Sequence, residues 1–154
     1  MTYDEFDPED PRLDRDRVLA TDADLQEVIE LLLQTANHRQ VWIFMLDEQQ
    51  RPTGPLIPMD GYPDAPDELV GTDDLGLVPF PRVFVERAGV ICEAVGGSAI
   101  VLIWERRGPE KFTADDRAWA RALAHEAGEH GPRLRAQFVL HSTGLRQITP
   151  DDYV

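Results

Sequence analysis

The sequence predicts an α/β (α+β) domain in which helices cover both faces of a mixed β-sheet. Apolar residues recur at helical spacing in three segments, and an unbroken apolar run at 99–104 is typical of a buried central strand. The predicted elements follow the order α-β-β-α-β-α-β-β, which favours a mixed sheet with helices on both sides. Because 154 residues suffice for one domain with a real core, we divide the chain into an acidic N-terminal tail, 1–20, and a single domain, 21–154.

The N-terminal part is predicted to be a tail followed by a helix. Residues 1–20 are rich in Asp, Glu, Arg and Pro, so this segment either stays solvated or docks on its own domain or on a partner. From Thr21 the apolar side chains recur three and four residues apart, which predicts a helix to about Asn37 with Thr21 or Asp22 as its N-cap.

A hairpin and a long connection come next. Val41 to Leu46 is predicted to be a buried strand, and Gly54 to Met59 is expected to return beside it as a second strand. Residues 60–76 mix prolines, glycines and acids, which predicts a long irregular connection of the kind that often carries function.

The second predicted helix begins at Pro79. Pro81 is tolerated in a first helical turn, and the apolar side chains downstream, Phe84, Ala88, Ile91 and Val95, follow one face of a helix. The β-branched residues of this segment leave a strand from Arg82 to Val85 as the competing interpretation.

The C-terminal half is predicted as strand, helix and two strands. The run Ala99 to Trp104 is the central strand, and the spacing Thr113-Ala-Asp-Asp116 is a capping box that opens the third helix. Gly131-Pro132 ends that helix, and two strands follow, at 134–140 and 145–149.

Composition excludes several classes of partner and cofactor. A net charge of −14 opposes binding to nucleic acid and to anionic membranes, because both depend on clustered Lys and Arg, and it suits a basic protein partner. The chain has one cysteine, Cys92, expected to be a small buried hydrophobe, and no Cys/His cluster, so we expect no metal and no cofactor. The first residues have neither a basic region nor an apolar run, which predicts a cytoplasmic protein.

Three short stretches carry a resemblance to a known family. They are Phe44-Met-Leu-Asp47 at a strand end, Pro81-Arg-Val-Phe84 at a helix start, and the series Ile103-Trp-Glu105-Arg, Gly108-Pro, Thr113-x-x-Asp116. Over residues 37–149 the chain resembles the RadC family of the JAB/MPN/JAMM superfamily of zinc metalloproteases and isopeptidases. That resemblance implies a RadC/JAB-MPN-like fold, similar to that of cytidine deaminases.

The same resemblance implies that the metal site has been lost. The family's two zinc-binding histidines fall on Ile103 and Glu105, and its catalytic glutamate falls on about Arg39. Asp116 keeps a ligand-type side chain and Thr113 keeps the hydroxyl of the motif serine. A catalytic zinc needs about three protein ligands, so the implied protein is a metal-free pseudoenzyme.

The candidate residues also have simpler interpretations. Thr113 and Asp116 are explained as a capping box, and Arg39, Glu105, Arg106 and Arg107 could all be solvated surface charges. The fold would otherwise bring Arg39 to ion-pair distance from Glu105 or Asp116, in the space that a metal fills in relatives. Trp104 either covers a face of the sheet or, beside two arginines, exposes a ring for recognition on a surface bordered by 60–76 and 104–111.

The leading functional hypothesis is a metal-free RadC-like domain that acts as a protein-binding or scaffold module, and a homodimer is an alternative assembly. A second hypothesis is a hydrolase with a rebuilt, non-zinc active site around Glu105 and Asp116, with His141 as a further candidate. A third is a small anionic ligand held by Arg39, Arg106 and Arg107.

Overall fold

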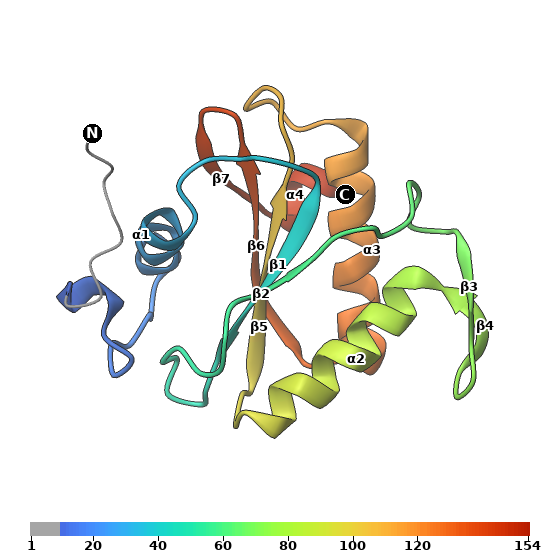
Figure 1. Cartoon of the computed structure of the whole chain (residues 1–154), viewed down its shortest axis with the longest axis horizontal. Coiled ribbons are helices and arrows are strands. Elements are labelled where there is room, and N and C mark those ends of the chain that lie inside the picture. The colour runs from blue at the N-terminus through green and yellow to red at the C-terminus, as the bar shows by residue number, and fades with distance from the viewer. Residues whose placement is uncertain (1–9) are drawn as a thin grey trace.

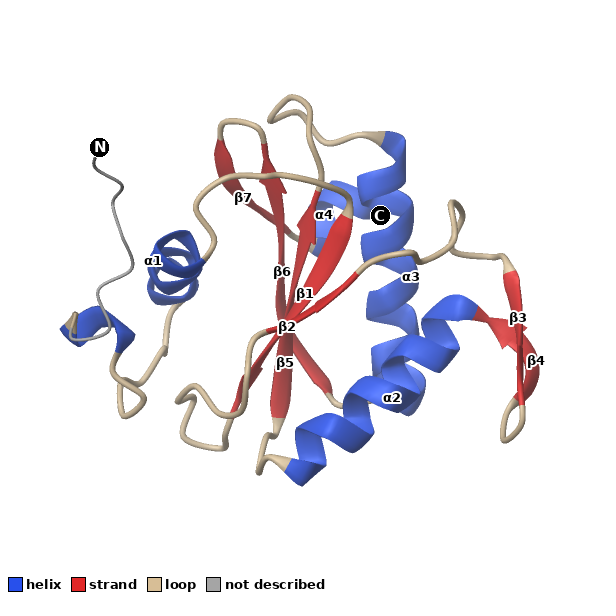
Figure 2. Ribbon diagram, viewed as in Figure 1, coloured by secondary structure: helices blue, strands red, loops and turns tan. Residues whose placement is uncertain are grey.

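A five-stranded mixed sheet runs through the centre of the molecule, with helices on both of its faces (Figures 1 and 2). The structure is a computed structural model, and it describes residues 10–154. The strand order is β2-β1-β5-β6-β7, with bounds β1 Gln40–Leu46, β2 Ile57–Met59, β5 Ala99–Glu105, β6 Arg133–His141 and β7 Gly144–Ile148. β5 and β6 are parallel and the other neighbours are antiparallel, so the predicted fold class is confirmed at this level.

The helices form two layers on opposite sides of the sheet. Helix α1, Asp22–Leu32, covers one face, whereas α2, Phe80–Ala94, and α3, Ala114–His130, cover the other (Figure 1). Side chains of a strand alternate between faces, and β5 follows this rule. Leu102 and Trp104 belong to the core under α2 and α3, whereas Ile103 belongs to the core under α1.

The central strand and the two helices on its second face follow the predictions closely. All seven residues of β5 are buried, as expected for a strand covered on both sides. Residues 80–94 form a helix rather than the alternative strand. The capping box of α3 is present, since Thr113 Oγ1 accepts from the Asp116 amide at 3.0 Å and Asp116 Oδ2 accepts from the Thr113 amide at 2.9 Å.

The connection 60–76 is not irregular throughout, and in this respect the prediction is wrong. Its second half contains β3, Leu69–Thr72, which pairs with β4, Gly76–Pro79, in a separate two-stranded hairpin at the edge of the molecule (Figure 1). Thr72 Oγ1 donates to the Gly76 carbonyl at 2.9 Å and accepts from the Leu75 amide at 2.9 Å, which closes the turn. Gly76 has a φ of +75°, a conformation that favours glycine.

The first helix is shorter than predicted, ending at Leu32 instead of near Asn37. Beyond it the backbone amides of Asn37 and His38 donate to the Glu105 carboxylate instead of to helical carbonyls. A contact distant in sequence therefore ends the helical pattern early.

The part of the predicted tail that the structure describes is docked on the domain. Leu19 is fully buried, and its amide donates to the Gln50 carbonyl at 2.8 Å. Arg17 pairs with Asp24 and Glu27 of α1 at 3.2 and 2.8 Å. The alternative in which this segment docks on its own domain thus holds for residues 10–20, while residues 1–9 lie outside the described part.

A short C-terminal helix, α4, Pro150–Tyr153, was not predicted. It begins with the same Thr-x-x-Asp spacing as α1 and α3, here Thr149 and Asp152. Tyr153 is buried, and its carbonyl accepts from Arg121 Nε at 2.6 Å. Within residues 10–154 no helix combines the length and apolar character needed to cross a membrane.

Candidate functional site

A pocket of 230 Å³ lies where the resemblance places an active site, between the end of β5 and the beginning of α3. We call it the aromatic pocket. Tyr62, Trp104 and Trp119 line its apolar part, and its polar residues are Arg39, Glu105, Arg106, Thr113, Asp115 and Asp116. Tyr62 comes from the segment 60–76 and Arg106 from the turn 104–111, so these two segments border one surface as expected.

The aromatic rings of this pocket pack against one another rather than facing solvent. Trp104 is only 5% exposed, and its ring centre lies 5.7 Å from that of Trp119 and 5.8 Å from that of Tyr62. Its indole N–H donates to Gln137 Oε1 at 2.8 Å. Burial raises the pKa of Tyr62 to about 12. Trp104 therefore covers the sheet face, and the expectation of an exposed ring for recognition is wrong.

Asp116 is held by a guanidinium, but not by the one expected. Arg106 Nη2 lies 2.7 Å from Asp116 Oδ2 and Nε lies 3.1 Å from Oδ1. The remaining donors of Arg106 reach the carbonyls of Pro109 at 2.7 Å and Lys111 at 3.1 Å. The ion pair and the capping box together use the Asp116 carboxylate, leaving it poorly suited to act as a base or a ligand.

Arg39 makes no ion pair with Glu105 or Asp116 among the described residues, which corrects the sequence-based expectation. Its two terminal nitrogens donate to the carbonyls of Tyr62 at 2.8 Å and Pro63 at 2.7 Å. The guanidinium carbon lies 3.7 Å from the centre of the Tyr62 ring, a cation–π contact. Arg39 therefore fixes the start of the segment 60–76 to the end of the sheet.

Glu105 is a buried anchor for the backbone that leads into β1. One carboxylate oxygen accepts from the Gln40 amide group and the Trp42 indole, both at 2.8 Å, and the other accepts from the Asn37 and His38 backbone amides. Burial by itself raises the pKa of Glu105, but these hydrogen bonds outweigh it and bring the pKa below its ordinary value. The carboxylate is charged, fully satisfied and structural.

The positions equated with the family's metal ligands do not converge. Ile103 belongs to the core under α1, and Glu105, two residues further along the strand, bonds Gln40 and Trp42 on that same face. Glu105 and Asp116 both line the aromatic pocket, but the Glu105 carboxylate is bonded to β1, whereas the Asp116 carboxylate is bonded to Arg106. Within residues 10–154 no group of three or more His, Cys, Asp or Glu side chains is arranged to hold a metal ion.

The remaining candidate residues, Arg107 of the ligand-binding hypothesis and His141 of the hydrolase hypothesis, also make contacts within the chain. Arg107 Nε donates to the Asn37 carbonyl at 2.6 Å, and Arg107 does not line the aromatic pocket. His141 is buried, which lowers its pKa, and its Nδ1 accepts from the Thr143 amide at 3.2 Å. The three arginines do not form an open anion site, and His141 does not join Glu105 and Asp116.

Comparison of the chain with protein-family models, with curated proteins and with solved structures found no match. The hollows of the surface are therefore the basis for inferring a function.

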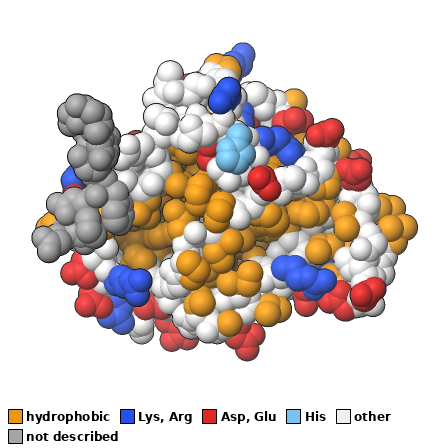
Figure 3. All heavy atoms as spheres, in the orientation of Figure 1, with side chains coloured by type: hydrophobic (Ala, Val, Ile, Leu, Met, Phe, Trp, Pro, Cys, Tyr) orange, Lys and Arg blue, Asp and Glu red, His pale blue; other side chains and the backbone are white. Residues whose placement is uncertain are grey.

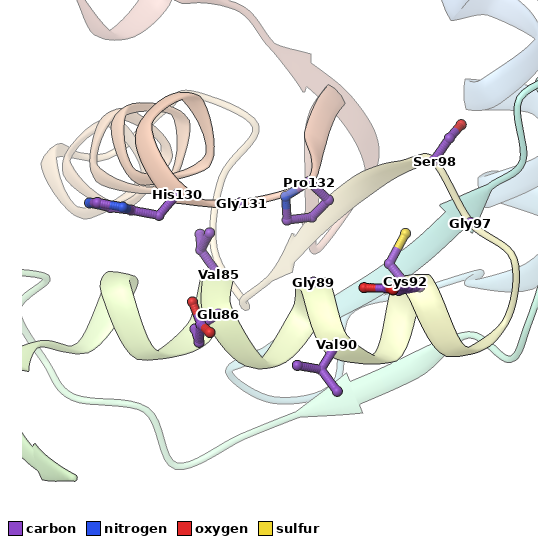
Figure 4. Close-up of a pocket in the computed structure, with 11 residues that line it drawn as sticks. Val85, Glu86, Gly89, Val90, Cys92, Gly97, Ser98, His130, Gly131 and Pro132 are labelled. Carbon is purple, nitrogen blue, oxygen red and sulfur yellow. The ribbon is translucent and has the colours of Figure 1, made fainter. Parts of the chain in front are cut away.

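A larger hollow of 440 Å³ lies beside α2, near the end of α3 and the beginning of β5 (Figure 4). Cys92 lines it, but its thiol is buried, which raises its pKa, and it points toward the Ala99 carbonyl at 3.9 Å. A Cβ at Gly97 would lie 2.5 Å from this sulfur, so the thiol is packed against the backbone. Cys92 is a small buried hydrophobe, as predicted, and its thiol is not available as a nucleophile.

A third depression is almost entirely apolar, and no motif pointed to it. This apolar groove, of 190 Å³, lies between the edge strand β2 and α2 and is lined by Ile43, Ile57, Pro58, Met59, Phe80, Val83, Phe84, Arg87, Ala88 and Ile91. Hydrophobic side chains form a band across this side of the molecule, where β2 and α2 lie in Figure 1 (Figure 3). Ile91, which lines the groove, is 36% exposed, and Val90, the residue before it, is 62% exposed and lines the 440 Å³ hollow.

The sequence does contain a signal for this surface. Helix α2 carries more large apolar residues than one helical face can bury, since Val83, Val90 and Ile91 accompany the buried Phe84 and Val85. The prediction placed Ile91 on the core-facing side, whereas it lies at the rim of the groove. A helix that is apolar on more than one side indicates a second contact surface.

Proposed function

We propose that this chain is a RadC-like JAB/MPN-type domain without a catalytic metal, and that it works as a protein-binding module through the apolar groove and the neighbouring residues Val90 and Ile91. The family part of the proposal is supported by the order strand β5, Gly/Pro loop and capped helix α3, within a mixed sheet that has helices on both faces.

The observation that carries the binding proposal is a contrast between two surfaces. At the end of β5 the polar side chains are used internally: Glu105 accepts four hydrogen bonds, and Asp116 is shared between Arg106 and the helix cap. At β2 and α2, in contrast, large apolar side chains border solvent (Figure 3). Exposed apolar patches of this kind are typical of protein interfaces.

The test places a photo-crosslinking residue at position 90 in the full chain, produced in its native cells, with position 18 as the control. Val18 is 49% exposed and lies near α1, on the other side of the sheet. A partner linked only from position 90 is then purified and titrated against the wild type and against Ile91→Gln. We expect at least about a tenfold loss of affinity in this variant, which is about 1.4 kcal/mol.

Two results would contradict the proposal. One is a partner that crosslinks equally from positions 18 and 90, and the other is unchanged affinity in Ile91→Gln. For the metal-free part, elemental analysis should find well below one zinc per chain, and a chelator should leave the melting temperature unchanged. About one equivalent of zinc, lost in Asp116→Ala, would overturn that part.

A further inference from the structure

The shape and charge around the apolar groove specify the occupant more closely than a protein in general. This inference rests on the proposed function and names its partner class. We infer that the groove takes an amphipathic helix from a basic partner, with the apolar face of that helix in the groove and its Lys or Arg side chains toward the acidic residues of the segment 57–95.

The edge of the sheet argues against a strand as the occupant. β2 is the edge strand, it is only three residues long, and its central residue is Pro58. Proline has no backbone N–H, so the central residue of β2 offers no main-chain donor to an added strand. A short edge strand with a proline is a common way to prevent strand addition. The occupant must therefore bind through side chains.

The lining of the groove suits a row of apolar anchors. Nine of its ten lining residues are apolar, and they come from β1, β2 and one side of α2. The exception, Arg87, is held by Asp74 through two hydrogen bonds of 2.8 and 2.9 Å, so it is not a free cation that would attract an acidic partner. Side chains spaced three and four residues apart on a helix form such a row.

The charge of this part of the chain favours a positively charged partner. The segment 57–95, which supplies nine of the ten lining residues, carries eight acidic side chains and two basic ones. Both basic side chains are paired, Arg87 with Asp74 and Arg82 with Glu86. An acidic surface accelerates and orients the approach of a basic segment. It also disfavours a second copy of this chain, which would bring a further charge of −14.

The experiment uses designed peptides as probes with the full chain. The first is a Leu/Lys peptide of about 14 residues, or about four helical turns, with leucines on one face. The second has the same composition in a scrambled order without an apolar face, and the third replaces every Lys by Glu. Binding is followed by fluorescence anisotropy. Ile91→Gln is the test variant and Val18→Gln is its matched control, because both residues are β-branched and partly exposed, Ile91 by 36% and Val18 by 49%.

We expect the amphipathic Leu/Lys peptide to bind at least about tenfold more tightly than the scrambled or the Leu/Glu peptide, with Ile91→Gln losing that preference and Val18→Gln keeping it. Added salt should weaken the binding without abolishing it, because the apolar part is not screened. Equal binding of the scrambled peptide, equal binding of the Leu/Glu peptide or an unaffected Ile91→Gln would each overturn the inference. The two proposals fail separately. If the peptides do not bind as expected but position 90 still crosslinks a partner whose affinity depends on Ile91, only this inference fails. If the affinity of that partner does not depend on Ile91, the proposed function fails as well.

Discussion

Arg106 and Asp116 form a two-point ion pair that joins the end of β5 to the first turn of α3, with Nη2 at 2.7 Å from Oδ2 and Nε at 3.1 Å from Oδ1. The same carboxylate accepts from the Thr113 amide, so one side chain serves the helix cap and the ion pair together. The Asp116 carboxylate is therefore engaged in two structural contacts at the position that the resemblance equates with a metal ligand.

The first prediction concerns this pair. Arg106→Ala should lower the free energy of unfolding by about 3 kcal/mol, because it leaves the nearly buried Asp116 carboxylate without its counter-charge. Arg107→Ala is the matched control and should cost about 1 kcal/mol or less, since that side chain is exposed and anchored by one hydrogen bond. Urea unfolding of both variants provides the measurement. Equal effects would mean that the ion pair contributes little.

The second prediction is a pH dependence that originates in Glu105. Its pKa in the folded chain is below the ordinary value of 4.5, so its contribution is fully present above pH 4.5 and is lost as the pH falls through the lowered value. Glu105→Gln removes this contribution and replaces one carboxylate oxygen, which accepts two hydrogen bonds, by an NH2 group that faces their donors. We expect it to destabilise the chain by about 1 to 3 kcal/mol at pH 7.

The difference between wild type and Glu105→Gln isolates this carboxylate, because other acids, such as Asp22 and Asp74, also have lowered pKa values. Unfolding free energies of the two proteins should therefore converge as the pH falls below 4.5. A gap that stays constant down to the lowest pH at which both fold would show that Glu105 is not the source.

The elements predicted most accurately were those whose signals are local. The apolar run of β5 and the capping box of Thr113 and Asp116 depend on neighbouring residues, and the structure contains both. The end of α1 depends instead on Glu105, about 70 residues away in the chain, and no periodicity near Asn37 reports that contact.

The candidate site was harder to predict than the fold, because partner choice depends on the strand face. Arg39 and Arg106 are equally plausible partners for Asp116 in sequence, and only the geometry selects Arg106. For the same reason, Ile103 and Glu105 can match a motif spacing while their side chains meet other partners: Ile103 packs in the core under α1, and Glu105 bonds Gln40 and Trp42. The α4 helix is different, since Thr149 and Asp152 carry the same spacing as the capping box predicted at Thr113 and Asp116.

The third prediction addresses Trp104, whose ring is core rather than surface. Trp104→Ala should cost about 3 to 5 kcal/mol, the range for deleting a buried aromatic side chain. Trp104→Phe keeps most of the ring but removes the donor to Gln137 Oε1, and should cost about 1 to 3 kcal/mol. Combining Trp104→Phe with Gln137→Leu measures the coupling between the two side chains. Additive effects would show that their hydrogen bond has little energetic weight.

The last prediction concerns the segment before α1. Leu19 is fully buried in the core under α1 and its amide is bonded to the Gln50 carbonyl, whereas its neighbour Val18 is 49% exposed. Leu19→Ala should lower the free energy of unfolding by about 2 to 5 kcal/mol, because it removes core volume, while Val18→Ala should change it by about 0.5 kcal/mol or less. Two adjacent positions with such different costs would show that residues 10–20 are part of the folded domain in solution. If both substitutions were nearly neutral, the segment would be a solvated tail after all, and the domain would begin at Thr21.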